Sequence, residues 1–66
     1  MHITYQGRSV ETDAETVAGF LAAMAVDPAK AIVEFDGEVY APGSDLAALR
    51  LVDGSALDVF RLTAGG

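Results

Sequence analysis

The sequence lacks cysteine altogether, which excludes disulfides, thiolate metal sites and catalysis by a Cys–His pair. It has a single histidine, His2, directly after the first residue. A metal site would therefore have to be built from carboxylates alone, and none is expected. No serine has a histidine partner other than His2, so an independent catalytic site is not expected either. The sequence is not predicted to be that of an enzyme.

Basic residues are also scarce, with four Lys and Arg against ten Asp and Glu, a formal net charge of −6 and a pI of about 4.2. Such a chain repels phosphate backbones and anionic lipids, so neither nucleic acid nor a membrane is an expected partner. The acidity either keeps a small apolar domain soluble or steers it onto a basic partner.

Long hydrophobic runs are missing as well, since no apolar stretch approaches the roughly 20 residues that span a bilayer. Residues 1–7 are polar and alternating, unlike a signal peptide, and cytoplasm is the expected location. The 66 residues are 52% hydrophobic, enough for one core. We expect a single domain over 1–66 with a flexible tail, 63–66.

The N-terminal residues follow the period-two pattern of β-strands. Ile3 and Tyr5 alternate with polar residues, Gln6-Gly7 interrupts the pattern, and Val10 alternates again beyond it. Two short alternating runs around a glycine-containing turn predict a β-hairpin, with Gly7 at a positive φ.

A helical pattern follows, because four large apolar residues recur at the i, i+3, i+4 and i+7 spacing from Val17 to Met24. Two start signals compete. Thr12 and Glu15 have capping-box spacing, while Thr16 directly precedes the first apolar residue, and we favour Thr16 as the N-cap. Pro28 restricts the residue before it to extended conformations, so the helix should end by about residue 26.

The second half returns to strand patterns. A hairpin is predicted from Ala31 to Tyr40 around Asp36-Gly37, then a short helical turn over 45–49 capped by Ser44 or Asp45, a turn at Asp53-Gly54 and a last strand over 56–63. This order predicts an α+β, β-grasp (ubiquitin-like) fold, with a mixed sheet of about five strands and one main helix across one face. The expected core comprises Val17, Phe20, Leu21, Met24, Ile3, Val10, Val33, Leu57 and Val59.

Several segments together resemble a known family. They are Thr16-Val17 at the helix start, Asp36-Gly37-Glu38 in the second hairpin, Asp53-Gly54 before the last strand and Ala64-Gly65-Gly66 at the end. Over its whole length the chain resembles the ubiquitin-like sulfur carriers of bacteria, and most closely the thiamin-biosynthesis (ThiS) type within the ThiS/MoaD-like family. After Val39-Tyr40 that family usually has Pro-Arg, whereas this chain runs Ala41-Pro42-Gly43.

The resemblance implies that Gly66 carries the sulfur. Its carboxylate would be adenylated by an E1-like (ThiF-like) enzyme, which uses ATP, and the resulting thiocarboxylate would serve a thiazole synthase (ThiG-like); no cofactor would be bound by the carrier itself. Ala64, Gly65 and Gly66 would thread into the enzyme, where glycine avoids the clash of a Cβ atom. A molybdopterin or other thiocarboxylate pathway, a ubiquitin-like protein modifier and an inert, frayed Gly-Gly end are the alternatives.

Docking residues are expected beside this tail. Phe60 and Leu62 lie on the face of the last strand opposite Leu57 and Val59, so they either dock a partner, joined by Tyr40, or close a secondary core under residues 41–51. Arg61 points to the other face, where it either pairs with an acidic group of the partner or is solvated.

Overall fold

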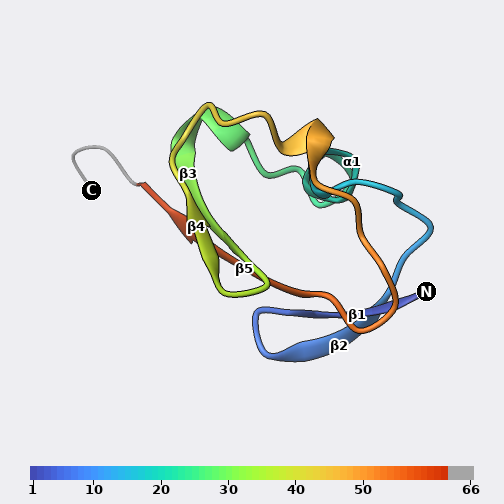
Figure 1. The fold of residues 1–66 in the computed structure, drawn as a ribbon. Coiled ribbons are helices and arrows are strands. Elements are labelled where there is room, and N and C mark those ends of the chain that lie inside the picture. The colour runs from blue at the N-terminus through green and yellow to red at the C-terminus, as the bar shows by residue number, and fades with distance from the viewer. Residues whose placement is uncertain (63–66) are drawn as a thin grey trace.

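The structure is a computed structural model that describes residues 1–62 (Figure 1). Its strands are β1 (His2–Tyr5), β2 (Arg8–Glu11), β3 (Ala31–Phe35), β4 (Glu38–Tyr40) and β5 (Ala56–Arg61). They form one sheet in the order β2-β1-β5-β3-β4, in which only β1 and β5 are parallel. This mixed five-stranded sheet with one α-helix confirms the predicted β-grasp fold. The predicted tail, 63–66, lies outside the described residues.

Both predicted hairpins are present, and each turns over two residues with positive φ. Gln6 and Gly7 have φ of 52° and 79°, and Asp36 and Gly37 have φ of 48° and 89°. Positive φ at both central residues defines the type I′ turn, whose twist matches that of paired strands. The turns thereby set the register, in which Tyr5 pairs with Arg8 and Phe35 with Glu38.

The helix α1 (Val17–Ala23) begins where the favoured signal placed it. The Oγ1 atom of Thr16 accepts a hydrogen bond of 3.1 Å from the backbone N–H of Gly19, so Thr16 is the N-cap. Thr12 Oγ1 instead accepts from the N–H of Ala14, and the alternative capping box is not formed.

The C-terminal end of α1 is a Schellman motif without glycine. Ala25 takes a positive φ of 58°, its N–H donates to the carbonyl of Ala22, and the N–H of Val26 donates to that of Leu21. The helix therefore ends at Ala23. Met24, which we expected in the buried stripe, is the C-cap residue and is 41% exposed, so this assignment was wrong.

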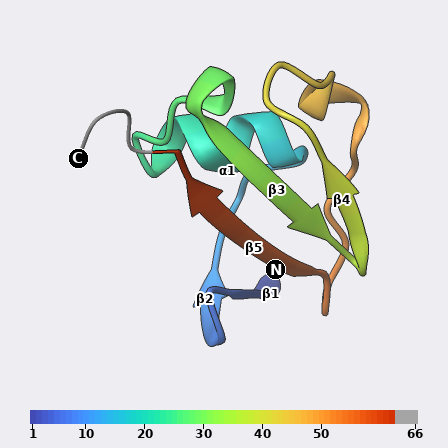
Figure 2. The same cartoon turned by 90° about the vertical axis from the view of Figure 1, so that its left-hand side faces the viewer.

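The hydrophobic core lies between α1 and the sheet, which the helix crosses on one face (Figure 2). The rings of Tyr5 and Phe20 meet edge to face with centroids 4.9 Å apart. Val10 is only partly buried. No helix within residues 1–62 is long and apolar enough to cross a membrane. The buried apolar residues are Ile3, Val17, Phe20, Leu21, Val26, Ala31, Val33, Leu46, Leu51, Leu57 and Val59.

Two 3-10 turns connect these elements, η1 (Pro28–Lys30) and η2 (Leu46–Ala48). The predicted helical turn is η2. Asp45 is its N-cap residue, although its side chain makes no capping hydrogen bond, while the Ser44 hydroxyl donates to the carbonyl of Ala41. The predicted turn at Asp53-Gly54 is present, with Gly54 at a φ of 91°.

Candidate functional site

The last strand, β5, lies inside the sheet and is held along both edges. It pairs in parallel with β1 and antiparallel with β3. Beyond the strand, the N–H of Leu62 donates a 2.8 Å hydrogen bond to the carbonyl of Lys30. The chain is therefore anchored to the sheet up to Leu62. The predicted sulfur-carrying and threading residues, Ala64, Gly65 and Gly66, lie outside the described residues.

The side chain of Gln6 extends the pairing of β5 past the end of β1. Its Oε1 atom accepts from the N–H of Val59 at 2.8 Å, and its Nε2 atom donates to the carbonyl of the same residue at 3.0 Å. The amide thus takes the place of one residue of a neighbouring strand. This contact satisfies backbone groups that would otherwise be exposed at the strand edge, and no local pattern in the sequence indicates it.

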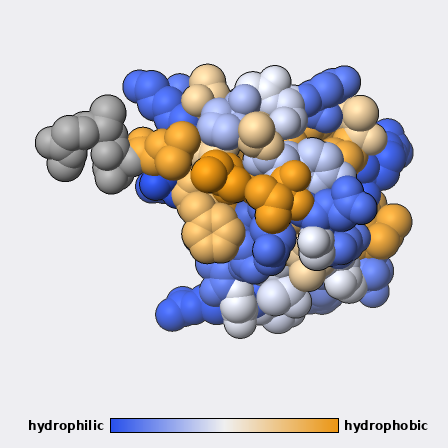
Figure 3. Space-filling view, turned by 60° about the vertical axis from the view of Figure 1, so that its left-hand side comes forward, coloured by the Kyte–Doolittle hydropathy of each residue, from blue (hydrophilic) through white to orange (hydrophobic). Residues whose placement is uncertain are grey.

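The sheet face turned away from α1, here called the outer face, carries exposed apolar side chains beside the end of β5. Phe60 is 56% exposed, Leu62 is 50% exposed, and Val39 on β4 is 68% exposed. Ile32, opposite Phe60 on β3, is half-buried. Figure 3 shows an area of orange and tan surface on one side of the molecule, bordered by hydrophilic surface. Of the two alternatives for Phe60 and Leu62, exposure on an open face is the one observed.

Tyr40 does not extend this outer face. It pairs with the buried Val33, so its side chain lies on the helix side of the sheet, where it packs against the core. The expectation that it joins Phe60 was therefore wrong in its geometry. Val39 occupies the corresponding position on the outer face, and neither Val39 nor Ile32 was anticipated, although the alternation from Ile32 to Val39 around the Asp-Gly turn would have indicated both.

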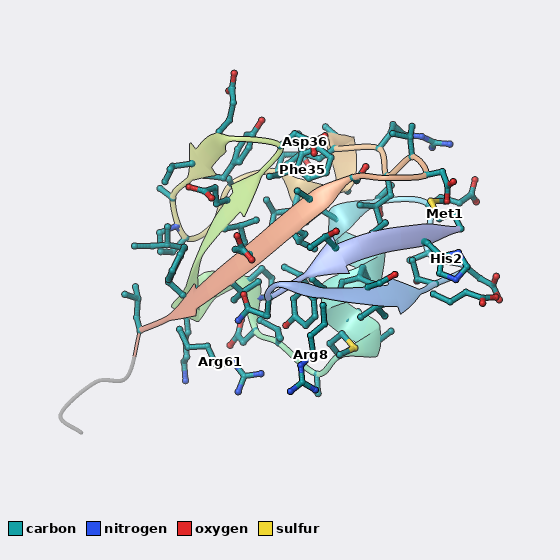
Figure 4. All side chains as sticks on the ribbon, turned by 90° about the horizontal axis from the view of Figure 1, so that it is seen from below. Met1, His2, Arg8, Phe35, Asp36 and Arg61 are labelled. Carbon is teal, nitrogen blue, oxygen red and sulfur yellow. The ribbon has the colours of Figure 1, made fainter. Side chains whose placement is uncertain are left out.

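Arg61 lies at the end of β5, opposite Ala31, and is exposed. It lines a shallow pocket of about 210 Å³ together with Val26, Lys30 and Leu62. Figure 4 shows Arg61 close to the point where the described chain ends, and Arg8 extending from the same side of the sheet at the first hairpin. Within residues 1–62, Arg61 has no acidic partner within salt-bridge distance, so the placement fits a solvated side chain as well as a contact to a partner.

Comparisons with known proteins identify the family. A scan against protein-family models finds no match, and a search of curated proteins finds none. Among solved structures, the crystal structure of thiamine biosynthesis protein ThiS from Geobacter metallireducens matches with a TM-score of 0.77 and 31% identity, over 100% of both chains. The chain belongs to the ThiS-type family of ubiquitin-like sulfur carriers. The ThiS-type assignment confirms the resemblance drawn from the sequence, and a ThiS-type carrier is a small protein rather than a catalyst in the usual sense.

Proposed function

We propose that this chain is the sulfur carrier of thiamin biosynthesis, with Gly66 as the residue that carries the sulfur. The observation that supports this most strongly is the full-length similarity to ThiS, at 31% identity and with the same fold. The sequence adds Ala64-Gly65-Gly66 at its end. In this proposal an E1-like (ThiF-like) enzyme of the cytoplasm activates the carrier, and a thiazole synthase (ThiG-like) consumes the sulfur.

The chemistry requires activation because a carboxylate is a poor electrophile. An oxygen of the Gly66 carboxylate attacks the α-phosphorus of ATP, pyrophosphate leaves, and an acyl-adenylate forms. Hydrosulfide then attacks the acyl carbon, the C–O bond to AMP breaks, and one proton is released, which leaves a thiocarboxylate and AMP. Both steps belong to the enzyme. The carrier supplies the reacting carboxylate and its position.

The folded domain would bind the enzyme during this reaction. Docking of the outer face would hold the reacting end at the enzyme, and binding energy used in this way raises its effective concentration. Because β5 is paired on both edges and extended by the Gln6 contact, the point where the tail begins is fixed relative to Phe60 and Leu62.

The proposal is tested by intact-mass spectrometry of the purified chain. After incubation with the E1-like enzyme, ATP and sulfide, the mass should rise by the difference between a sulfur and an oxygen atom. Omission of ATP should leave the mass unchanged. An unaltered mass in the complete reaction, with an enzyme that modifies a known ThiS under the same conditions, would count against the proposal.

Phe60→Asp is expected to weaken binding to the E1-like enzyme by about tenfold or more, because a central apolar anchor contributes roughly 2 kcal/mol to a typical interface. The fold should be retained, since Phe60 is exposed. Titration calorimetry measures the affinity, and urea denaturation measures the stability.

Val52→Asp provides the matched control, because Val52 is 61% exposed and lies in the loop before β5, not on a strand of the sheet. It introduces the same charge and should leave the affinity close to that of the wild type. Equal loss of affinity in both variants would assign the effect of Phe60→Asp to net charge, and loss of folding would place Phe60 in a core.

A further inference from the structure

Two acidic residues occupy directly opposite positions in the middle of the outer face. Glu34 on β3 and Asp58 on β5 are directly opposite in the antiparallel register, and both are partly buried. Side chains directly opposite on one face have Cβ atoms roughly 5 Å apart. Like charges at that separation destabilise the sheet. The isolated domain therefore carries a repulsion at this position.

No cation within residues 1–62 relieves the repulsion. The salt bridges among these residues join His2 to Glu11 and Arg50 to Glu15, both away from the pair. Among the residues that the structure describes, no basic nitrogen lies within salt-bridge distance of Glu34 or Asp58. Arg61, the nearest basic residue along β5, belongs by its pairing with Ala31 to the opposite face of the sheet.

Apolar side chains adjoin the carboxylates. Val39 pairs with Glu34 on the β4 side, and the pair formed by Ile32 and Phe60 occupies the next row of the same face. A protein that covers these apolar groups also covers the carboxylates and removes water from them. An entirely apolar partner surface would then bury two unpaired like charges, which is strongly unfavourable. The face thus favours a partner that brings a cation to this point.

We infer that the outer face docks a protein surface that presents an arginine surrounded by apolar side chains, and that this guanidinium bridges Glu34 and Asp58. A guanidinium has five N–H donors in a planar fork, so it can serve two neighbouring carboxylates at once. The occupant is the E1-like adenylating enzyme, an identification that rests on the proposed function. The repulsion in the free carrier is relieved in the complex, which makes the acidic pair a specificity element for that enzyme.

The test separates stability from binding. Glu34→Gln and Asp58→Asn each remove one charge of the pair while nearly preserving shape. Each should raise the midpoint of urea denaturation, because the repulsion is gone, and each should weaken binding to the E1-like enzyme from the same organism at least about tenfold. The affinity of both variants should also fall less steeply with added NaCl than that of the wild type.

Asp13→Asn is the control, since it removes one charge from an exposed residue between β2 and α1. Its affinity should stay near that of the wild type. If the wild type binds and Glu34→Gln and Asp58→Asn bind equally well, the inference is overturned while the proposed function stands. A lower urea midpoint in both variants would also overturn it. If the wild type itself fails to bind the enzyme, the proposed function fails first and the inference with it.

Discussion

Removal of Gly66 is expected to abolish thiocarboxylate formation while leaving the domain folded and able to dock. The variant still ends in a carboxylate, but its arm is shorter by one residue, or about 3.5 Å. Reacting atoms must approach to roughly 3–3.5 Å, and a displacement of about 1 Å can lower a rate about 100-fold. The loss in rate should therefore be at least about 100-fold.

The adenylation rate of the deletion variant is measured by the release of pyrophosphate in the presence of the E1-like enzyme and ATP. Calorimetry on the same sample measures its affinity, which should stay close to that of the wild type because β5 and the outer face are unchanged. Adenylation of the shortened chain at the normal rate would show that the reaction does not depend on a carboxylate at the position of Gly66. This result would contradict the proposed role of the tail.

Leu57→Ala is expected to remove most of the stability of the domain. Leu57 is fully buried, and it pairs with Tyr5 on one side and with Phe35 on the other, so the cavity would open at the centre of the sheet. A Leu-to-Ala change in a core costs about 2–5 kcal/mol. A domain of this size has a total stability on the order of 3–5 kcal/mol. A large fraction of the variant should therefore be unfolded at 25 °C.

Urea denaturation followed by circular dichroism measures this effect. Val52→Ala is the control, because it shortens an exposed loop residue and should change the free energy of unfolding by no more than about 0.5 kcal/mol. A Leu57→Ala variant as stable as this control would contradict the assignment of Leu57 to the centre of the core.

Local signals in the sequence were sufficient to predict most elements of the fold. The turns at Gln6-Gly7 and Asp36-Gly37 carry residues that accept positive φ, so both hairpins could be placed before the structure was known. Thr16 could be chosen as the N-cap because it directly precedes Val17, the first apolar residue of the helical pattern, and its hydroxyl accepts a hydrogen bond from the N–H of Gly19. Signals of this kind depend only on neighbouring residues.

Features that depend on tertiary contacts could not be predicted. The helix ends at Ala23 because Ala25 adopts a left-handed conformation. An alanine side chain does not favour this conformation, which glycine adopts most readily, so the residue type at position 25 does not indicate the helix end. The buried Leu21 and Val26 accompany this ending. Met24 consequently lies at the helix cap and not in the stripe that its spacing indicated.

Only part of the candidate site could be predicted, because the rest depends on tertiary contacts. Alternation along the last strand placed Phe60 and Leu62 opposite Leu57 and Val59, as observed, but whether they were covered depended on where residues 41–51 pack. The face of Tyr40 depended on its register with β3. The opposition of Glu34 and Asp58 arises from the pairing of two strands 20 or more residues apart in sequence, which no local pattern encodes.

The most direct test of the account is to locate the sulfur on the modified carrier. Fragmentation of the intact product by tandem mass spectrometry should show the mass increase in every fragment that contains Gly66 and in none that ends before it. An increase on any other residue, or a complete reaction with an active enzyme that yields no increase, would contradict the claim that the last carbonyl of this chain carries the sulfur.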